Sequence, residues 1–293
     1  MASERSIGRE LLDTVPSGRT VHNMAVFIPG LNISAGGANP NVADVGGLTI
    51  GNQQQATIHG SSTSDQRQLM DGMSVNPGGG NASAFVFNMG STQEVTIDTS
   101  GLSAEDSAGG VRITAIPREG GNQFHTTIYG DGAGPSLQGT NVTADLTARG
   151  FPTPNPLKSL NKAYTFTPAG GGPLIKDKLW IYLAGNRTVE STYVSIAPNK
   201  NAYNPNAWTY VPDTTAPFGT YDTTVQGING RLTWQINPKN KLAFYQDTQS
   251  RCICPAAAVT QSPEAQPWRS WPLERMTSAI YTARANLKPL VFE

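Results

Sequence analysis

Hydrophobic and polar residues alternate with a period of two through the second half of the chain. Such alternation predicts strands with one apolar and one polar face. In 231–236, for example, the apolar residues occupy the even positions and the polar residues the odd positions. On this basis strands are predicted at 124–129, 163–167, 178–184, 231–236, 241–246 and 278–287, and a further strand begins at 290–292.

The connections between these strands alternate in length. Short turns are expected at 170–177, 237–240 and 288–289. The other connections, which join the first strand to the second and run through 198–224 and 251–275, are long and rich in Gly, Pro and polar residues. Outer-membrane β-barrels have this asymmetry, with short turns at one rim and long loops at the other. A soluble β-sandwich also alternates, but loops above about 15 residues are uncommon in compact domains. The pattern is typical of a membrane barrel and leaves a sandwich as the alternative.

One hairpin is specified in detail by its sequence. We expect 231–246 to turn at Asn237-Pro238-Lys239-Asn240, because Pro suits the second position of a type I turn and Asn the flanking positions. The apolar residues of both strands should then share one outward face. They are Leu232, Trp234, Ile236, Leu242 and Phe244.

The first 120 residues or so show a mixed pattern that predicts a small α/β domain. Asp71-Gly72 marks a turn within 67–75. A Gly- and Asn-rich loop is expected over 31–51. Short helices are predicted at 6–12 and 21–27, with a helix start at 85–89, and short strands at 56–58, 94–97 and 111–116.

Composition narrows the class of protein to which the chain can belong. The 293 residues carry 21 Lys+Arg and 21 Asp+Glu, and this zero net charge argues against a nucleic-acid partner. Only two Cys are present, which excludes a disulfide-dense scaffold. No apolar stretch reaches the roughly 18 residues of a membrane helix. The first residues also lack the apolar run of a signal peptide. This absence is expected of a cytoplasmic protein, and equally of a cropped reading frame.

Five segments resemble, in order, motifs of the TonB-dependent outer-membrane receptors. Residues 15–31 resemble the opening of the receptors' plug domain, and 68–76 (QLMDGMSVN) their LDG hairpin. Residues 93–110 (QEVTI … SAEDSAGG), 116–124 (IPREGGNQF) and 171–180 (GGPLIKDKLW) resemble the "QE … AE … GG" segment, the passage from plug to barrel, and an early barrel turn. The match is closest to the large receptors whose plug often follows a carboxypeptidase regulatory-like domain.

The resemblance implies an α+β plug domain at 1–121, followed at 122–293 by the first six to seven antiparallel strands of a transmembrane β-barrel. Because the family barrel has about 22 strands, the chain is interpreted as a fragment. It departs from the family at Ile58-His59-Gly60, where many plugs have Arg-Gly or Asn-Gly, and no energy-coupling box is visible before Val15.

The resemblance also implies a function in the outer membrane. The expected role is energised uptake of a large, scarce ligand, such as an iron chelate, a cobalamin or an oligosaccharide, without catalysis or a cofactor. The implied partners are a periplasmic energy-coupling protein of the TonB type, outer-membrane lipid and the transported ligand. Two alternatives remain: a structural or adhesive outer-membrane barrel, and a soluble carbohydrate-active β-protein, which would need paired carboxylates about 5–10 Å apart.

Few side chains suggest a chemical site. The three histidines have no Cys or His neighbour at metal-ligand spacing, and no Gly-x-Ser-x-Gly or His-Glu-x-x-His motif is present. Cys252 and Cys254 are expected to form an extracellular disulfide, with a metal site or free thiols as alternatives. Aromatic residues of the long loops are candidates for ligand contact, or for the interfacial aromatic girdle. They are Tyr203, Trp208, Tyr210, Trp268 and Trp271.

Overall fold

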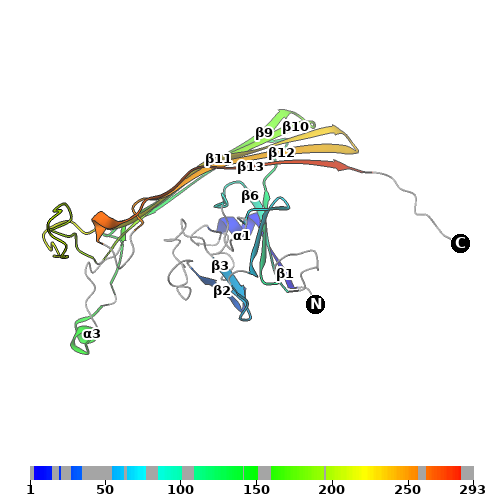
Figure 1. Cartoon of the computed structure of the whole chain (residues 1–293). Coiled ribbons are helices and arrows are strands. Elements are labelled where there is room, and N and C mark those ends of the chain that lie inside the picture. Colours follow the sequence, from blue (N-terminus) through cyan, green and yellow to red (C-terminus); the bar gives the residue numbers. More distant parts are fainter. Residues whose placement is uncertain are drawn as a thin grey trace.

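The residues that the structure describes form three sheets, of two, five and six strands. The six-stranded sheet (the large sheet) arches over the five-stranded sheet (the small sheet) and the two-stranded pair (Figure 1). The computed structural model describes residues 3–14, 20, 28–34, 55–62, 65–76, 85–100, 109–140, 142–150, 160–194, 196–256 and 262–284.

The small sheet is mixed, in the order β1-β6-β7-β4-β5. Strands β4 and β7 are parallel, whereas the other neighbours are antiparallel. A separate antiparallel pair joins β2 to β3. The elements are β1 (Ser3–Gly8), α1 (Arg9–Thr14), β2 (Leu31–Ser34), β3 (Gln55–Ile58), β4 (Arg67–Met70), β5 (Met73–Ser74), β6 (Thr92–Ser100) and β7 (Arg112–Pro117).

Apolar residues of β6 and β7 form the centre of the core. Val95, Ile97 and Ile113 are completely buried, and Leu12 of α1 packs into the same cluster. Burying each such side chain stabilises the fold by about 1.5–3 kcal/mol. Both strands lie where the alternation of the sequence predicts them.

Three N-terminal expectations are wrong. The first helix begins at Arg9 rather than at Ser6, because Ser6–Gly8 belongs to β1, which pairs along β6 with Ile7 opposite Val95. The predicted loop 31–51 starts with strand β2. The segment 85–89 is not helical, because its backbone groups are bound by side chains from elsewhere in the chain, described below. The predicted helix at 21–27 lies outside the described residues.

The large sheet is antiparallel, with its strands in chain order from β8 to β13. It is not closed, so β8 and β13 are its two edges among the described residues. The described parts of the long connections 134–159, 194–219 and 254–268 lie at one end of the sheet, and the short turns lie at the other end (Figure 1). The elements are β8 (His125–Ala133), α3 (Ala144–Ala148), β9 (Leu160–Ile175), β10 (Leu179–Tyr193), β11 (Thr220–Asn237), β12 (Asn240–Ile253), η2 (Pro263–Ala265) and β13 (Arg269–Ala283).

The strands of the large sheet are much longer than the alternation predicts. Strand β9 continues through Gly170–Gly172, so the turn that the sequence suggested at 170–177 is confined to 176–178. Strand β11 starts at Thr220, within the expected long loop. The predicted turn at 288–289 and the strand at 290–292 lie outside the described residues.

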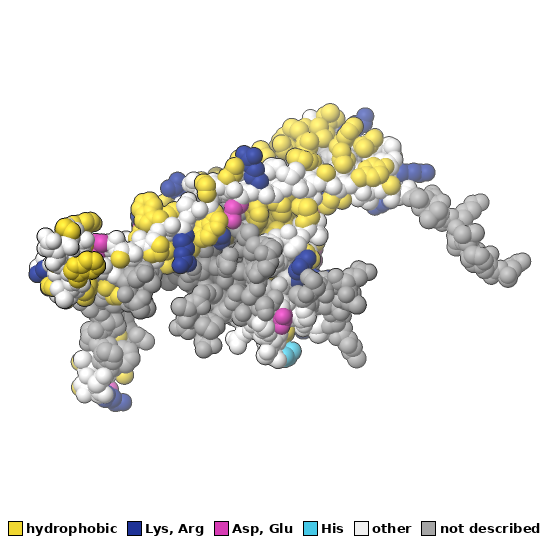
Figure 2. Space-filling model, viewed as in Figure 1, with side chains coloured by type: hydrophobic (Ala, Val, Ile, Leu, Met, Phe, Trp, Pro, Cys, Tyr) yellow, Lys and Arg dark blue, Asp and Glu magenta, His cyan; other side chains and the backbone are white. Residues whose placement is uncertain are grey.

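The hairpin of β11 and β12 is confirmed. Asn237 pairs with Asn240 around a two-residue turn, and Leu232 pairs with Phe244. Trp234 is 46% exposed on the face that points away from the small sheet (the outer face), whereas Arg231 is 8% exposed on the opposite, inner face. Figure 2 shows hydrophobic side chains gathered on the large sheet toward its turn end. None of the helices in the described segments is long and apolar enough to cross a membrane.

Two of the sequence motifs meet where the chain passes from the small sheet to the large one. The side-chain oxygen of Asn122 accepts hydrogen bonds from the Asp177 N–H at 3.0 Å and from the Trp180 indole at 2.8 Å. A Cβ on Gly120 would lie 2.5 Å from the Ile181 carbonyl oxygen, so only glycine fits against this strand. The Gly-Gly-Asn segment therefore fixes the beginning of the large sheet against the β9–β10 turn.

Candidate functional site

The inner face of the large sheet is polar where it covers the small sheet. Thr233, Asp247 and Gln249 are each less than 5% exposed. Tyr245 and Met276, from β12 and β13, pack in the same cluster as the core of the small sheet. The two sheets thus share a boundary that combines a few apolar contacts with many polar ones, and this boundary is the candidate site.

Ion pairs join the sheets near the turn end. The Arg231 guanidinium contacts Asp71 at 2.8 Å and Glu119 at 3.2 Å, and Lys241 contacts Glu119 at 2.6 Å. Asp71 occupies the turn before Gly72 with a φ of 52°, so the turn residue also serves as the anion. The side chains of Arg231 and Asp71 are 8% and 12% exposed, which makes this pair largely desolvated.

A second set of contacts is neutral and holds the segment 85–92. The side-chain amide of Gln249 accepts from the Val86 N–H and donates to the Val86 carbonyl, each at 3.0 Å. The Tyr182 hydroxyl donates to the Gly90 carbonyl at 3.1 Å. From the other side, Arg9 donates to the carbonyls of Met89 and Thr92. These bonds satisfy backbone groups that a helix would otherwise pair internally.

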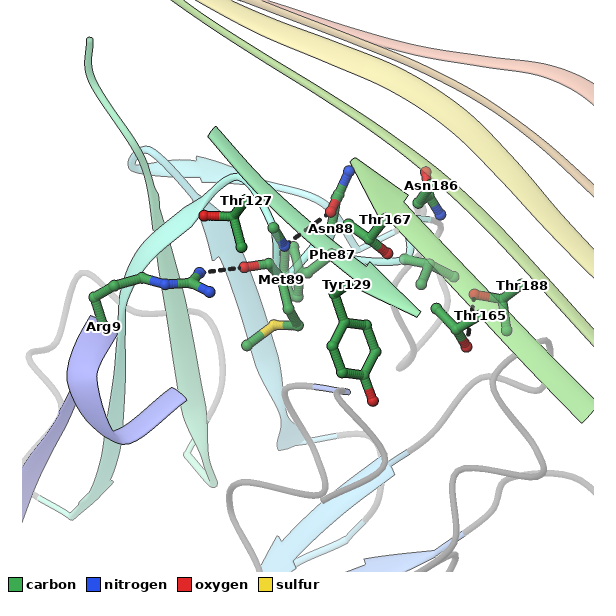
Figure 3. Close-up of a pocket in the computed structure, with 12 residues that line it drawn as sticks. Arg9, Phe87, Asn88, Met89, Thr127, Tyr129, Thr165, Thr167, Asn186 and Thr188 are labelled. Carbon is green, nitrogen blue, oxygen red and sulfur yellow. Dashed lines mark hydrogen bonds between the residues drawn. The ribbon is translucent and has the colours of Figure 1, made fainter. Parts of the chain in front are cut away.

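A narrow cavity lies between this segment and strands β8 to β10 (Figure 3). Its volume is about 30 Å³, enough for a water molecule. Threonine side chains of the large sheet line one side. The side chain of Asn88 is 3% exposed, and its amide nitrogen has no hydrogen-bond partner among the described residues. The contact between the sheets is therefore imperfectly packed here.

Replacing Gln249 by Ala is expected to weaken this contact. Both hydrogen bonds to Val86 are lost, together with the one that Gln249 donates to Asp247 at 3.2 Å. At about 0.5–1.5 kcal/mol each, these losses should lower the free energy of unfolding in detergent by about 1.5–4.5 kcal/mol. The matched control is Gln226→Ala on the outer face, because the side chain of Gln226 has one hydrogen-bond partner among the described residues, Arg187 at 3.4 Å. Equal losses for the two variants would show that the bonds to Val86 contribute nothing special.

The structure separates the five aromatic candidates into two groups. Tyr203 and Trp208, in the connection 194–219, are 90% and 96% exposed, and Trp268 is 76% exposed immediately before β13. Tyr210 instead donates to the Ala197 carbonyl within its own loop. Trp271 lies on β13, where the Arg251 guanidinium stacks 4.3 Å from its ring centre. Tyr203, Trp208 and Trp268 are thus presented to solvent at the long-loop end.

The connection 194–219 has internal hydrogen bonds that hold its shape. The Asn199 side chain accepts from the N–H groups of Asn201 and Val211, and its own N–H donates to Glu264 of the neighbouring long connection. Thr215 donates to Asp213 from its hydroxyl and its N–H, and these bonds lower the pKa of the Asp213 carboxyl. The exposed rings of Tyr203 and Trp208 therefore stand on a loop that its own hydrogen bonds hold in shape.

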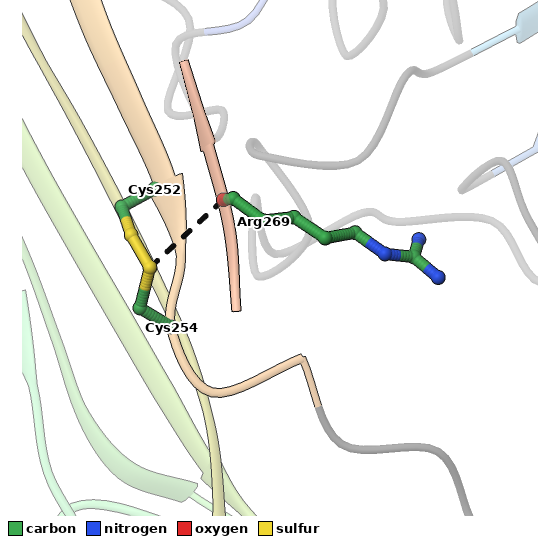
Figure 4. The surroundings of a disulfide bond; sticks show 3 residues. All are labelled: Cys252, Cys254 and Arg269. Carbon is green, nitrogen blue, oxygen red and sulfur yellow. Dashed lines mark hydrogen bonds between the residues drawn. A yellow bond between two sulfur atoms is a disulfide. The ribbon is translucent and has the colours of Figure 1, made fainter. Parts of the chain in front are cut away.

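Cys252 and Cys254 lie at the end of β12 and are joined as a disulfide in the structure (Figure 4). Their Cα atoms are 5.5 Å apart, and the Cys254 sulfur lies 3.9 Å from the Arg269 carbonyl oxygen. The described residues contain no group of three or more His, Cys, Asp or Glu side chains placed to hold a metal ion. The pairing belongs to the long-loop end of the large sheet.

Arg231, Glu119 and Gln249 were not recognised as site residues from the sequence. The alternation does place Arg231 on the face opposite to that of Leu232. A charged residue on the inward face of a barrel strand was therefore the available signal. Glu119 and Asp71 each lie inside a recognised motif, but they precede Arg231 by 112 and 160 residues. Nothing in the sequence of β12 distinguishes Gln249 from the other polar residues of that strand.

Comparison with known proteins gives one type of relative. No protein-family model matches the chain. The TonB-dependent transporter Oar of Myxococcus xanthus is 27% identical over an alignment of 241 residues, and the match covers 76% of this chain and 22% of that protein. The chain thus spans about a fifth of the length of the curated relative that it matches.

Solved structures share the fold. The outer-membrane transporter YddB of Escherichia coli matches 85% of this chain and 33% of its own, with a TM-score of 0.61 and 11% identity. The ferric enterobactin receptor PfeA of Pseudomonas aeruginosa matches 97% of this chain and 38% of its own, with a TM-score of 0.56 and 16% identity. The siderophore receptor PirA of Acinetobacter baumannii matches 85% of this chain and 31% of its own, with a TM-score of 0.55 and 18% identity. The chain therefore resembles TonB-dependent receptors, and the predicted fold, a plug followed by antiparallel strands of an unclosed barrel, is confirmed.

Proposed function

We propose that the chain is the plug and the opening wall strands of an outer-membrane transporter that takes up a large, scarce ligand. The energy would come from a periplasmic protein of the TonB type. The small sheet corresponds to the plug and the large sheet to the wall, divided as the sequence suggests at about 121. The relatives are transporters and receptors rather than enzymes.

One observation carries the proposal. Toward the turns the wall is apolar on its outer face and polar on its inner face, and the plug is held against that inner face by side-chain contacts. A wide barrel in lipid needs this arrangement, because its outside meets hydrocarbon and its lumen holds a polar plug. The same arrangement argues against a soluble sandwich, in which both sheets bury their apolar faces against each other.

The exposed rings of Tyr203 and Trp208 support ligand capture at the long-loop end. Their loop is ordered by its own hydrogen bonds, so little entropy is lost when a ring contacts a flat or apolar ligand surface. An interfacial girdle accounts less well for these two rings, because they stand on a loop rather than on a strand. Trp234 and Tyr281 on the outer face are better placed for a girdle.

The test is energised uptake by the complete protein that contains this chain. Cells expressing it would be given three radiolabelled probes: ferric enterobactin, cyanocobalamin and a maltodextrin. We expect uptake of one probe, and loss of that uptake when the energy-coupling protein is deleted. Binding at the cell surface without energy-dependent uptake would favour the structural or adhesive alternative instead.

Replacing Trp208 by Ala is expected to weaken capture of the transported probe by about two- to tenfold, since an aromatic contact contributes about 0.5–1.5 kcal/mol. Trp208→Phe keeps a ring and should retain most of the affinity. The measurement is the probe concentration for half-maximal binding to cells without the energy-coupling protein. Identical values for Trp208→Ala and the unmodified protein would remove Trp208 from the ligand site.

A further inference from the structure

The outer face of the wall carries a groove that continues from an apolar part into a polar part. The apolar part, about 330 Å³, is formed around Gly230 by Leu183, Ile228, Leu232 and Phe244. The polar part, about 380 Å³, is lined by Arg187, Gln226, Ser250 and Leu273 among others. Ile228 and Thr248 line both, so the two parts are continuous. We call the whole feature the outer groove.

The apolar part exists because Gly230 has no side chain. A Cβ at this position would lie 2.6 Å from the Leu183 side chain. The side chains around Gly230 project from the sheet and form the sides of the groove, since Ile228 is 61% exposed, Leu183 49% and Phe244 43%. Glycine inside a strand often marks such a place, where another group approaches the backbone closely.

The groove crosses the level at which the outer face changes from apolar to polar. Below it, toward the turns, β11 presents Ile228 to Ile236, a stretch that matches the roughly 9–11 residues of a membrane strand. Above it, the next outward residue of β11 is Gln226, which is paired with Arg187 on β10. Arg187 is exposed, and the only partner of its guanidinium among the described residues is Gln226, so its charge is not neutralised.

From this geometry we infer that the outer groove binds an anionic lipid, with the acyl chain beside Gly230 and the phosphate of the headgroup at Arg187. The inference rests on the proposed function, because it requires the outer face to lie in a membrane. A cation at the headgroup level, next to the apolar part of the outer groove, is complementary to a phosphate group joined to a hydrocarbon chain. A second protein copy fits less well, because Arg187 would then need a carboxylate partner at the same depth.

The test measures which lipid stays on the 293-residue chain in detergent micelles. Dimyristoyl phosphatidylglycerol, which is anionic, and dimyristoyl phosphatidylcholine, which is zwitterionic, would be added separately, and retained lipid counted by native mass spectrometry. We expect the anionic lipid to be retained about fivefold better, the factor that one basic residue gives near an anionic membrane surface. Equal retention of the two lipids would overturn the inference.

Variants assign the effect to the groove. Arg187→Gln should lower retention of the anionic lipid to that of the zwitterionic one, whereas Lys162→Gln, an exposed cation of β9 outside the groove, should not. Gly230→Leu, which fills the apolar part, should reduce retention of both lipids. Ile228→Gln makes the same part polar without approaching the backbone, and serves if Gly230→Leu does not fold. Gly130→Ala, on the outer face of β8 with no atom closer than 3.8 Å, is the control.

The outcomes separate this inference from the proposed function. Equal losses of anionic-lipid retention in Arg187→Gln and Lys162→Gln would overturn the inferred lipid site, because the attraction would then come from the general charge of the outer face. A chain that enters micelles but shows no lipid preference contradicts the groove alone. A chain that never enters micelles contradicts both the groove and the proposed membrane location.

Discussion

Replacing Arg231 by Met is expected to cost about 3–5 kcal/mol of the free energy of unfolding in detergent, the range for breaking a buried ion pair from one side. The Asp71 carboxylate would remain 12% exposed and lose its cation. Glu119 would keep Lys241 at 2.6 Å, so Asp71 carries most of the penalty. Guanidinium-induced unfolding of the refolded chain, followed by tryptophan fluorescence, measures the loss.

The charge on Asp71 can be removed to test this reasoning. Asp71 has a φ of 52°, a left-handed conformation that Asn adopts as readily as Asp. Adding Asp71→Asn to Arg231→Met should therefore restore part of the lost stability. Lys241→Ala is the matched comparison at the same boundary, because Lys241 and Glu119 are each about one-third exposed. Its expected cost is only about 0–1 kcal/mol, and a cost equal to that of Arg231→Met would contradict the role assigned to desolvation.

The two sets of contacts between plug and wall differ in what breaking them would require. The Arg231–Asp71 pair exposes two charges that are now largely excluded from water. The bonds from Gln249 and Tyr182 to the segment 85–92 are neutral, and water can replace them at little cost. If part of the plug moves during transport, the segment 85–92 is the part that the wall releases more easily.

The sequence predicted where the wall strands lie but not how long they are. Near the turns, one face meets hydrocarbon and the other meets the plug, so residues alternate strictly, as in 231–236. Toward the long loops both faces of β10 become polar, as in Asn186 to Thr192, and the alternation disappears although the ladder to β11 continues. Strand pairing in that region rests on backbone hydrogen bonds, which leave no pattern in the side chains.

Short N-terminal elements were harder to predict for a different reason. Ile7, Leu11 and Leu12 have a spacing that suits a helix, and a segment this short does not separate the two periods. The edge of β6 determines which structure forms, because it pairs with β1 as far as Gly8 and so keeps Ser6–Gly8 in a strand. Similarly, the partners of Arg231 are fixed by how plug and wall dock, which no local pattern contains.

The 293 residues, expressed alone, are expected to be insoluble without detergent. The wall is an open sheet among the described residues, so its edge strands present unpaired N–H and C=O groups that can pair with other chains. Its outer face also exposes a contiguous apolar surface, which includes Ile228 at 61%, Tyr281 at 60% and Trp234 at 46%. Size-exclusion chromatography with and without detergent measures the outcome.

Two kinds of variant distinguish the apolar face from the open edge as the cause. Replacing Ile228, Trp234 and Phe244 together by Thr lowers the hydrophobicity of the face and leaves the edges unchanged. Thr282→Lys adds a charge to the edge strand β13 on the inner face, opposite Lys241, a device that discourages edge-to-edge pairing. We expect the first change to recover far more soluble protein, because the part of the outer face that meets lipid must be apolar, and that part is large. If the unmodified chain elutes without detergent as a monodisperse monomer with a cooperative melt, its strands must bury that face against each other, and the membrane location would have to be abandoned for a soluble β-domain.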